Sequence, residues 1–340
     1  MQPLVSVTMA TYNVEEYIYA SLQCIIQQSL ENIEVICIDD GSTDKTVSIL
    51  KECAANDERI KVISKVKNEG LSMARNAGLE IAKGKYICFV DGDDLMDINL
   101  FEKAYQLAEL NNSDLVIWDF VTFWNTNEIE EKKQKPSSLI SNSKEDTKAL
   151  LKQPAFTWLK LIKTDVARSL GISFPNGLTK QDIPVHWHLL TKISDIAILP
   201  ERLSYYRQQP KATSYKTDAH LFDIATILDI TEAFLKKNNL FENYKDVFLK
   251  QQLSLLSAMY DFVDEPLKSE AMLKIKQRLG NEQLGYIASN KPLLWQTRIF
   301  YKTIQGSLKA KLKFKIWLFM RSSYRYLKGS LASILKKNKV

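Results

Sequence analysis

The feature that most constrains this chain is an apolar run that leads directly into three carboxylates. Residues 86–90 read Tyr-Ile-Cys-Phe-Val, and Asp91, Gly92, Asp93 and Asp94 follow. An uninterrupted apolar run of this kind is typical of a strand buried on both faces of a parallel sheet. The acids could belong to a solvated loop that caps the next helix. Their place favours a divalent cation instead, because ligands of open α/β sheets bind at the carboxyl ends of the strands.

The segment before and after this run alternates between strand-like and helix-like patterns. The strand-like ranges are 4–9, 33–38, 60–64, 86–90 and 115–124. The helix-like ranges begin near residues 18, 45, 71 and 97. Such alternation with short connections predicts an α/β fold, with a mostly parallel sheet wrapped by helices. No GxGxxG motif follows the first strand, so the fingerprint of dinucleotide-binding folds is missing.

Polar residues gather where three of these strands end. They lie in the segments 10–13 (Ala-Thr-Tyr-Asn), 39–44 (Asp-Asp-Gly-Ser-Thr-Asp) and 91–94. Parallel strands place all three segments at one edge of the sheet, so they face one crevice. A ring that stacks on a base, acids that accept hydrogen bonds and a cation site together suit a nucleotide diphosphate. Arg75 could add a further cation beside the nucleotide.

Four motifs in order resemble the inverting glycosyltransferase family 2 of bacterial cell-surface polysaccharide synthesis, which has the GT-A fold. They are residues 5–13 (VSVTMATYN), 34–44 (EVICIDDGSTD), 68–78 (NEGLSMARNAG) and 89–94 (FVDGDD). Residues 181–186 and 203–207 match later motifs of the family less closely. The resemblance covers residues 1–215. It implies a nucleotide-sugar half at 1–124 and an acceptor half at 147–215.

The resemblance implies a role for each matching residue on the donor side. Tyr12 and Asp40 would contact the uracil of a UDP-sugar donor, and Asp91 and Asp93 would be the metal-binding acids. Asp93 would be the direct ligand of Mg²⁺ or Mn²⁺. The remaining residues expected in the nucleotide-sugar pocket are Thr11, Asn13, Asp39, Arg75 and Gly92.

On the acceptor side, the resemblance implies that Asp182 is the general base. It would take the proton from the acceptor hydroxyl while the anomeric carbon is inverted in one displacement. Gln181, His186 and Trp158 are candidate acceptor contacts. Family members commonly have Glu where Gln181 stands, so a part of that acid in positioning the acceptor would pass to an amide here.

The C-terminal third lies outside the resemblance. Residues 216–290 show helical periodicity and predict a helical appendage. Residues 291–340 contain 13 Lys or Arg and no Asp or Glu, interleaved with apolar residues, while the rest of the chain holds 33 basic and 40 acidic residues. This tail could contact an anionic membrane surface, bind nucleic acid or pack on the acidic body. We expect the membrane contact and no nucleic acid partner.

Cysteine usage and hydropathy predict the compartment. The four cysteines (Cys24, Cys37, Cys53 and Cys88) are scattered without a CxxC pair, as expected of reduced residues in a cytoplasmic protein. No leader or membrane-spanning segment is visible. We therefore expect a cytoplasmic enzyme, peripheral at the inner face of the cell membrane. It would transfer a hexose or N-acetylhexosamine to a growing glycan such as capsule, lipopolysaccharide or another lipid-linked saccharide.

Two other functions are compatible with parts of this pattern. A sugar nucleotidyltransferase would need a glycine-rich basic loop after the first strand, which residues 10–13 do not provide. A non-catalytic glycan-binding or scaffolding protein would agree with Gln181, but Asp91, Asp93 and Asp182 are retained. Self-association into a homo-oligomer stays open.

Overall fold

The computed structural model describes residues 2–137, 139, 146–210 and 216–280, together with residues 283, 304 and 306. The chain divides into two compact units. One contains residues 1–215 and 229–241, and the other contains residues 216–228 and 242–340. The predicted basic tail, residues 291–340, lies outside the described residues except for residues 304 and 306.

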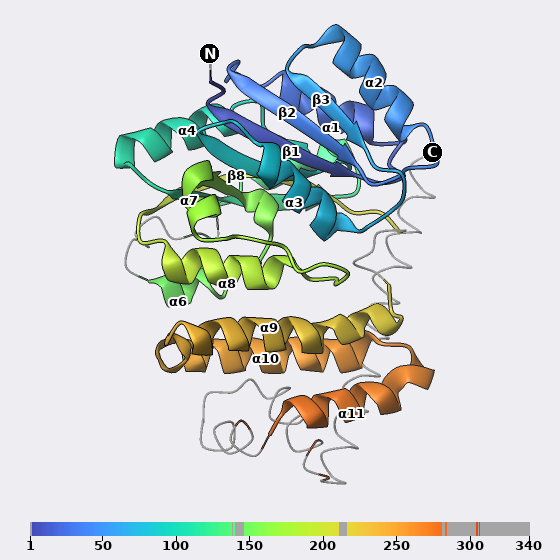
Figure 1. Ribbon diagram of the computed structural model, residues 1–340, viewed down its shortest axis with the longest axis vertical. Helices are drawn as coiled ribbons and strands as arrows, with labels where there is room; N and C mark the ends of the chain where they lie inside the picture. Colours follow the sequence, from blue (N-terminus) through green and yellow to red (C-terminus); the bar gives the residue numbers. More distant parts are fainter. Residues whose placement is uncertain are drawn as a thin grey trace. The chain divides into compact units, whose positions relative to one another are not determined.

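The first unit is built on one eight-stranded sheet (Figure 1). Its strands are β1 (Val5–Thr11), β2 (Ile33–Asp39), β3 (Ile60–Ser64), β4 (Tyr86–Asp91), β5 (Leu95–Met96), β6 (Leu115–Phe123), β7 (Lys160–Lys163) and β8 (Ile196–Arg207). They lie in the order β3-β2-β1-β4-β7-β6-β8-β5. The first four positions are parallel, whereas β7 runs antiparallel to both of its neighbours. The predicted mostly parallel α/β architecture is confirmed.

Helices connect and cover these strands. They are α1 (Ile18–Ile26), α2 (Thr46–Asn56), α3 (Leu71–Ile81), α4 (Leu100–Asn111), α5 (Ile129–Lys133), α6 (Thr147–Leu150), α7 (Thr164–Ser169) and α8 (Asp182–Lys192). A short 3₁₀ helix, η3 (Thr157–Leu159), precedes β7. Helix α3 packs on β1 and β2, and α2 packs on β3.

The apolar pattern of the sequence explains the layers. All seven residues of β2 are buried, and the same holds for the first five residues of β4, because helices cover both faces of this part of the sheet. Helix α1 buries Ile18, Leu22 and Ile25, which recur at the spacing of one helical face. These side chains join one core with the inner residues of β1, β2 and β4.

Two predicted boundaries differ from the structure. The predicted motif 203–207 is the end of a longer strand, β8, because an irregular register beside Trp118 and Asp119 lets residues 196–207 stay paired with β6. The helix expected from residue 97 begins at Leu100, because Leu95 and Met96 form β5 and pair with β8 instead.

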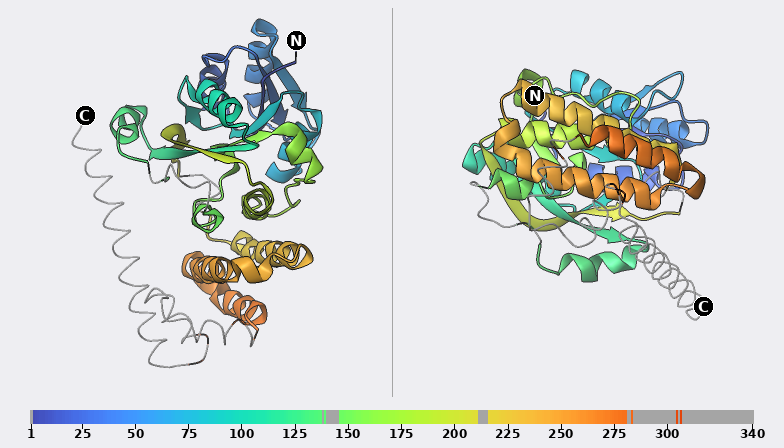
Figure 2. Two further views of the ribbon diagram at one scale, coloured as in Figure 1. Left: turned by 90° about the vertical axis from the view of Figure 1, so that its left-hand side faces the viewer. Right: turned by 90° about the horizontal axis from the view of Figure 1, so that it is seen from below.

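The C-terminal helices agree with the predicted appendage. Helix α9 (Asp223–Lys237) spans the boundary between the two units, and α10 (Phe241–Phe262) and α11 (Lys268–Arg278) follow it (orange in Figure 2). Among the described residues, no helix is long and apolar enough to cross a membrane. All four cysteines are free, as predicted.

Candidate active site

The register of three parallel strands brings the polar segments together. Ala10 on β1 is paired with Asp91 on β4, and Thr11 is paired with Asp39 on β2. The segments that follow these residues therefore leave the sheet at the same edge. This is the predicted arrangement, and it results from strand register alone.

The loops after β1 and β2 are tied to each other. Asn13 adopts a left-handed backbone conformation with φ of 51°, and its side-chain oxygen accepts from the Thr43 N–H at 2.8 Å. The Asn13 N–H donates to Ser42 Oγ at 2.9 Å. Asp39 is buried and accepts from the Ser42 N–H at 3.0 Å and from Thr11 Oγ1 at 3.4 Å. Thr11, Asn13 and Asp39 thus lie together at this edge of the sheet.

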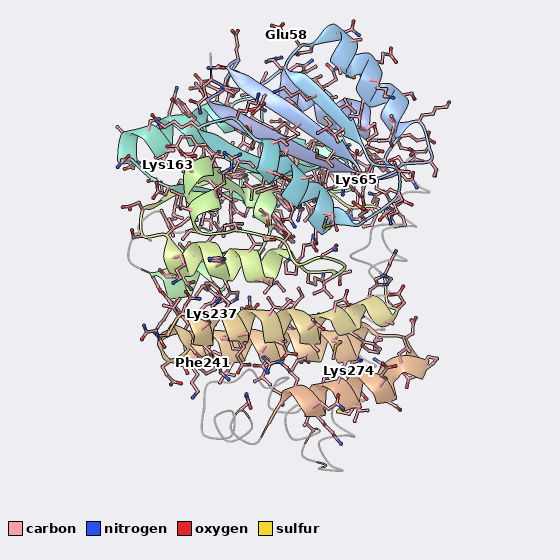
Figure 3. All side chains as sticks on the ribbon, in the orientation of Figure 1. Glu58, Lys65, Lys163, Lys237, Phe241 and Lys274 are labelled. Carbon is pink, nitrogen blue, oxygen red and sulfur yellow. The ribbon has the colours of Figure 1, made fainter. Side chains whose placement is uncertain are left out.

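Asp40 holds the start of α3. Its carboxylate accepts from the N–H groups of Glu69 at 3.1 Å and Gly70 at 2.7 Å, and Lys65 Nζ lies 3.1 Å from its Oδ1 (Lys65 is labelled in Figure 3). Gly70 has φ of 95°, a conformation that favours glycine. The Asp40 carboxylate already binds this turn, so the expected contact with a base would use the same carboxylate.

Tyr12 and Gly92 differ sharply in exposure. The Tyr12 side chain is 46% exposed at the sheet edge, so its ring is accessible to a ligand. Gly92 is buried, and a Cβ atom there would lie 2.9 Å from Thr11 Cγ2. Glycine at this position lets β4 approach β1 and α1 closely.

Arg75 on α3 connects two acids from different parts of the fold. Its Nη2 donates to Asp91 Oδ1 at 2.8 Å, and its Nη1 donates to Asp182 Oδ1 at 2.6 Å. The side chain is 2% exposed, and its guanidinium lies over the Phe174 ring at 5.4 Å. Burial lowers the pKa of Arg75, but Asp182 and Asp91 outweigh it and the pKa is raised. Arg75 therefore aligns the two acids, and its predicted place beside the nucleotide stays a prediction.

Asp182 is the first residue of α8, where a carboxylate interacts favourably with the helix dipole. Its Oδ1 accepts from Thr157 Oγ1 at 2.5 Å as well as from Arg75. Among the described residues, Oδ2 has no hydrogen-bond partner, and the side chain is 19% exposed. One oxygen is therefore anchored twice and the other is free to accept a proton.

The three predicted acceptor contacts are all buried. Gln181, in the orientation that satisfies both ends of its amide, accepts from Arg75 Nη1 at 3.3 Å and donates to the Leu178 carbonyl at 3.1 Å. Trp158 stacks on Phe156, with ring centroids 4.8 Å apart. His186 is 2% exposed. All three side chains are packed inside the protein, and their contact with an acceptor stays a prediction.

The acids after β4 are held by the end of β8. Gln209 Nε2 donates to Asp93 Oδ2 at 2.6 Å, and Arg207 Nε donates to the Asp93 carbonyl at 2.7 Å. The Arg207 N–H donates to Asp94 Oδ1 at 2.8 Å, so Asp94 holds β8 and not the following helix. Burial and the nearby charge of Asp91 raise the pKa of Asp93 to about 6.

The donor set fits a divalent cation that is shared with a ligand. Among the described residues, no group of three or more His, Cys, Asp or Glu side chains is arranged to hold a metal ion. Mg²⁺ commonly takes one or two carboxylates and completes its shell with substrate phosphates and water. Asp91 keeps one oxygen without a described partner, and the raised pKa of Asp93 shows that a nearby positive charge would be favoured.

Thr157, Arg207 and Gln209 are site residues that the motif comparison did not assign. Thr157 reaches Asp182 from η3, and the other two reach Asp93 from the end of β8. The position of Arg207 directly after the tyrosine pair of β8 was the one available signal in the sequence.

Comparison with known proteins agrees with this geometry. The family described as "Glycosyl transferase family 2" matches residues 6–167. EpsH of Bacillus subtilis, which carries a provisional glycosyltransferase name, is 30% identical over 257 residues, covering 72% of each chain.

Solved structures show the same fold at low sequence identity. S. aureus TarS 1–349 in complex with UDP-GlcNAc is 20% identical, with a TM-score of 0.56 over 86% of this chain and 93% of that chain. The mannosyltransferase PcManGT of Pyrobaculum calidifontis, in complex with GDP-Man and Mn²⁺, is 18% identical, with a TM-score of 0.53 over 93% and 88%. The chain therefore belongs to glycosyltransferase family 2, has the GT-A fold and is a glycosyltransferase.

Proposed function

We propose that this glycosyltransferase moves a sugar from a UDP-sugar to an acceptor hydroxyl with inversion at the anomeric carbon. The observation that carries this proposal is the guanidinium of Arg75, which holds Asp91 and Asp182 together while each acid keeps one oxygen without a described partner. An acid on the donor side and a base on the acceptor side must flank the same sugar, and one buried cation sets their spacing.

The base in this proposal is Asp182 Oδ2. It accepts the proton of the acceptor hydroxyl as that oxygen forms its bond to the anomeric carbon, and the bond from this carbon to the diphosphate oxygen breaks with its electron pair. Because Thr157 and Arg75 occupy Oδ1, the carboxylate does not need to rotate before it accepts the proton. Attack from the side opposite the leaving diphosphate inverts the configuration.

The leaving group is charged, and the residues after β4 are suited to a cation that stabilises it. Asp91 and Asp93 would hold Mg²⁺ or Mn²⁺ together with the diphosphate oxygens. When bound, such an ion neutralises the charge that develops on the diphosphate. Mn²⁺ in the PcManGT structure supports this choice.

The donor side is proposed from exposure and from the solved relatives. The accessible ring of Tyr12 could stack on a base, and the Asp39 and Asp40 segment lies at the same sheet edge. TarS was solved with UDP-GlcNAc and PcManGT with GDP-Man, so the fold alone accommodates either nucleotide. We favour UDP, and a hexose or N-acetylhexosamine, from the resemblance of residues 34–44 to the family motif.

We further propose that the acceptor is a growing cell-surface glycan, such as a lipid-linked saccharide, met at the inner face of the cell membrane. Support comes from the tail 291–340, whose 13 basic residues are unopposed by acids. Each basic residue near an anionic surface contributes on the order of 1 kcal/mol. Replacing Lys309, Lys311, Lys313 and Lys315 by Gln should weaken binding to vesicles that contain phosphatidylglycerol, and unchanged binding would refute the membrane contact.

A screen of donors tests the proposed function. The purified protein is incubated with UDP- and GDP-sugars in the presence of Mg²⁺, Mn²⁺ or EDTA, and both thermal stabilisation and release of the nucleotide are measured. We expect at least one UDP-sugar to stabilise the protein and to be hydrolysed slowly, only with metal. Stabilisation without turnover for every donor would favour the glycan-binding or scaffolding alternative.

A further inference from the structure

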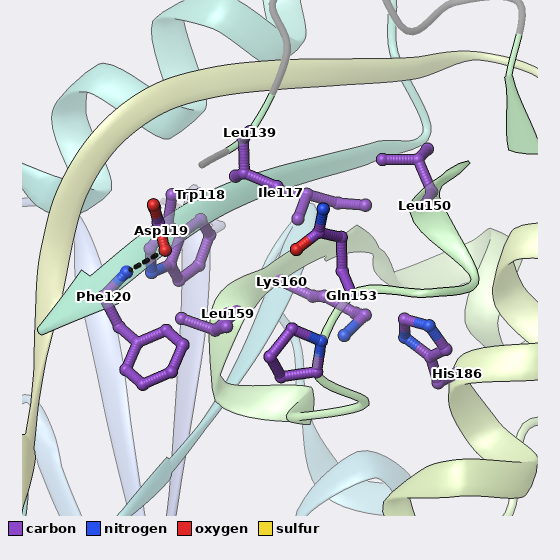
Figure 4. A pocket seen from close by; sticks show the side chains of 11 residues that line it. Ile117, Trp118, Asp119, Phe120, Leu139, Leu150, Gln153, Leu159, Lys160 and His186 are labelled. Carbon is purple, nitrogen blue, oxygen red and sulfur yellow. Dashed lines mark hydrogen bonds between the residues drawn. The ribbon is translucent and has the colours of Figure 1, made fainter. Parts of the chain in front are cut away.

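A buried lysine lies three residues after Thr157, whose hydroxyl binds the proposed general base Asp182. Lys160, the first residue of β7, is 1% exposed, and its Nζ donates to the Phe156 carbonyl at 2.6 Å. Figure 4 shows Lys160 and His186 among the side chains that line a small cavity between β6, β7 and α8. A lysine is rarely buried to this extent unless its charge is compensated.

Lys160 interacts electrostatically with two side chains of α8. Asp182 and His186 are four residues apart and so lie on one face of that helix. Burial lowers the pKa of Lys160 to about 8, and the charge of Asp182 opposes this effect. Burial and then the charge of Lys160 lower the pKa of His186. The charge of Asp182 therefore favours the protonated ammonium group of Lys160.

The carbonyl that Lys160 binds belongs to the residue before Thr157. The Thr157 hydroxyl donates to Asp182 Oδ1 at 2.5 Å, so a chain of two hydrogen bonds runs from Lys160 through residues 156–157 to the base. The Phe156 ring also stacks on Trp158, with an interplanar angle of 13°. The Lys160 side chain thus binds the segment 156–160 back to its own first residue.

We propose that Lys160 is a positioning residue for the general base: its ammonium group fixes the Phe156 carbonyl and thereby the Thr157 hydroxyl that orients Asp182. The proposal rests on the proposed function of Asp182. Without the lysine, residues 156–157 lose their anchor, and the carboxylate is free to turn its free oxygen away from the acceptor. Lys160 does not touch the donor in this account, so its loss changes turnover and leaves nucleotide binding intact.

Two substitutions of Lys160 separate the hydrogen bond from mere packing. Lys160→Met keeps the length of the side chain but cannot donate, whereas Lys160→Gln keeps a neutral donor. Lys163→Met is the control, because Lys163 lies on the same strand but pairs with Asp114 at 3.0 Å (Lys163 is labelled in Figure 3). The assay is metal-dependent hydrolysis of the UDP-sugar selected in the donor screen, with UDP binding measured separately.

We expect Lys160→Met to lower kcat by about tenfold while KM for the donor and the Kd for UDP stay within about twofold. Lys160→Gln should recover most of this loss, and Lys163→Met should match the parent protein. Thermal unfolding shows whether each variant is folded. A Lys160→Met variant that is folded and keeps full kcat would overturn the proposal, as would an equal rise in KM or the Kd for UDP.

A double-mutant cycle with Thr157→Val tests the route of the effect. If Lys160 acts through Thr157, the Lys160→Met change should lower kcat by less than about twofold in the Thr157→Val background. Independent effects that multiply would contradict this route. Failure of the proposed function is recognised separately, because Asp182→Asn would then retain turnover whatever the Lys160 variants do.

Discussion

Asp91 and Asp182 share one guanidinium group: Arg75 donates to Oδ1 of each acid, at 2.8 and 2.6 Å. Asp91 ends a central strand, whereas Asp182 begins a helix far along the chain. The buried arginine therefore fixes the distance between the metal-side acid and the proposed base, which neither β4 nor α8 fixes alone.

Arg75→Lys should damage both function and stability, because a single ammonium group cannot bond to both acids in the geometry of a guanidinium. We expect turnover to fall by about 100-fold and the free energy of unfolding to fall by about 3 kcal/mol. Urea unfolding and donor hydrolysis measure the two effects. Arg168→Lys is the control, since Arg168 binds carbonyl oxygens at the other end of α3. Equal losses in both variants would contradict the pairing of the acids as the cause.

Asp93→Asn should abolish metal-dependent turnover but stabilise the metal-free protein. Burial and Asp91 raise the pKa of Asp93 to about 6, so the folded state binds this proton more tightly than the unfolded chain. Metal-free stability therefore falls as the pH rises from about 4 to about 6, and neutralising the side chain removes that loss, about 3 kcal/mol at pH 7.

Asp97→Asn is a matched control of opposite sign for this experiment. Burial raises the pKa of Asp97, but hydrogen bonds from Asn99 and Tyr205 outweigh it and the pKa is lowered. Chemical denaturation in EDTA should therefore show Asp93→Asn stabilised and Asp97→Asn destabilised. A loss of stability in both variants would refute the charge repulsion inferred for the acids after β4.

His186→Phe should reduce the sensitivity of the protein to acid. Burial and the charge of Lys160 hold the pKa of His186 well below its usual value, so the unfolded chain binds a proton that the folded state does not. Stability is then lost as the pH falls below about 6.5, by up to about 1.4 kcal/mol for each pH unit. The variant should lose less stability between pH 7.5 and 5.5 than the parent. Identical pH profiles for the parent and His186→Phe would show that another group controls the loss.

Asp40→Asn should affect the turn before α3 as well as donor binding. Its carboxylate accepts from two backbone N–H groups and pairs with Lys65, so removing the charge should cost about 1–3 kcal/mol of stability. Binding of UDP, measured by calorimetry on the folded variant, should weaken at least tenfold if the carboxylate also contacts the base. Unchanged UDP binding in a less stable protein would limit Asp40 to the structural role.

The polar edge of the sheet could be predicted because continuous apolar runs mark buried parallel strands, and parallel strands end at the same edge of a sheet. Continuous apolar segments ending in Asp39 and Asp91 marked buried parallel strands, and their acids meet where expected. Similarity to the family supplied Asp182, which no spacing argument could connect to Asp91. The sequence could not show that Arg75 contacts both Asp91 and Asp182. These contacts depend on how α3 and α8 pack together.

The acceptor side was harder to predict because aromatic residues and histidine serve a core as readily as a ligand site. Trp158 and His186 proved to be buried, and the link from Thr157 to Asp182 arises from a 3₁₀ turn without a sequence signature. The contact of Gln209 with Asp93 depends on the path of β8 past the acids, which the irregular pairing with β6 determines.

The central claim is that Asp182 takes the acceptor proton, and Asp182→Asn tests it most directly. The amide oxygen of Asn can still accept from Arg75 and Thr157, so the site keeps its shape while the base is lost. The measurement is kcat for metal-dependent turnover of the selected UDP-sugar, together with the Kd for UDP. We predict that kcat falls by about 10³-fold with the Kd unchanged. Turnover close to that of the parent protein would contradict the account.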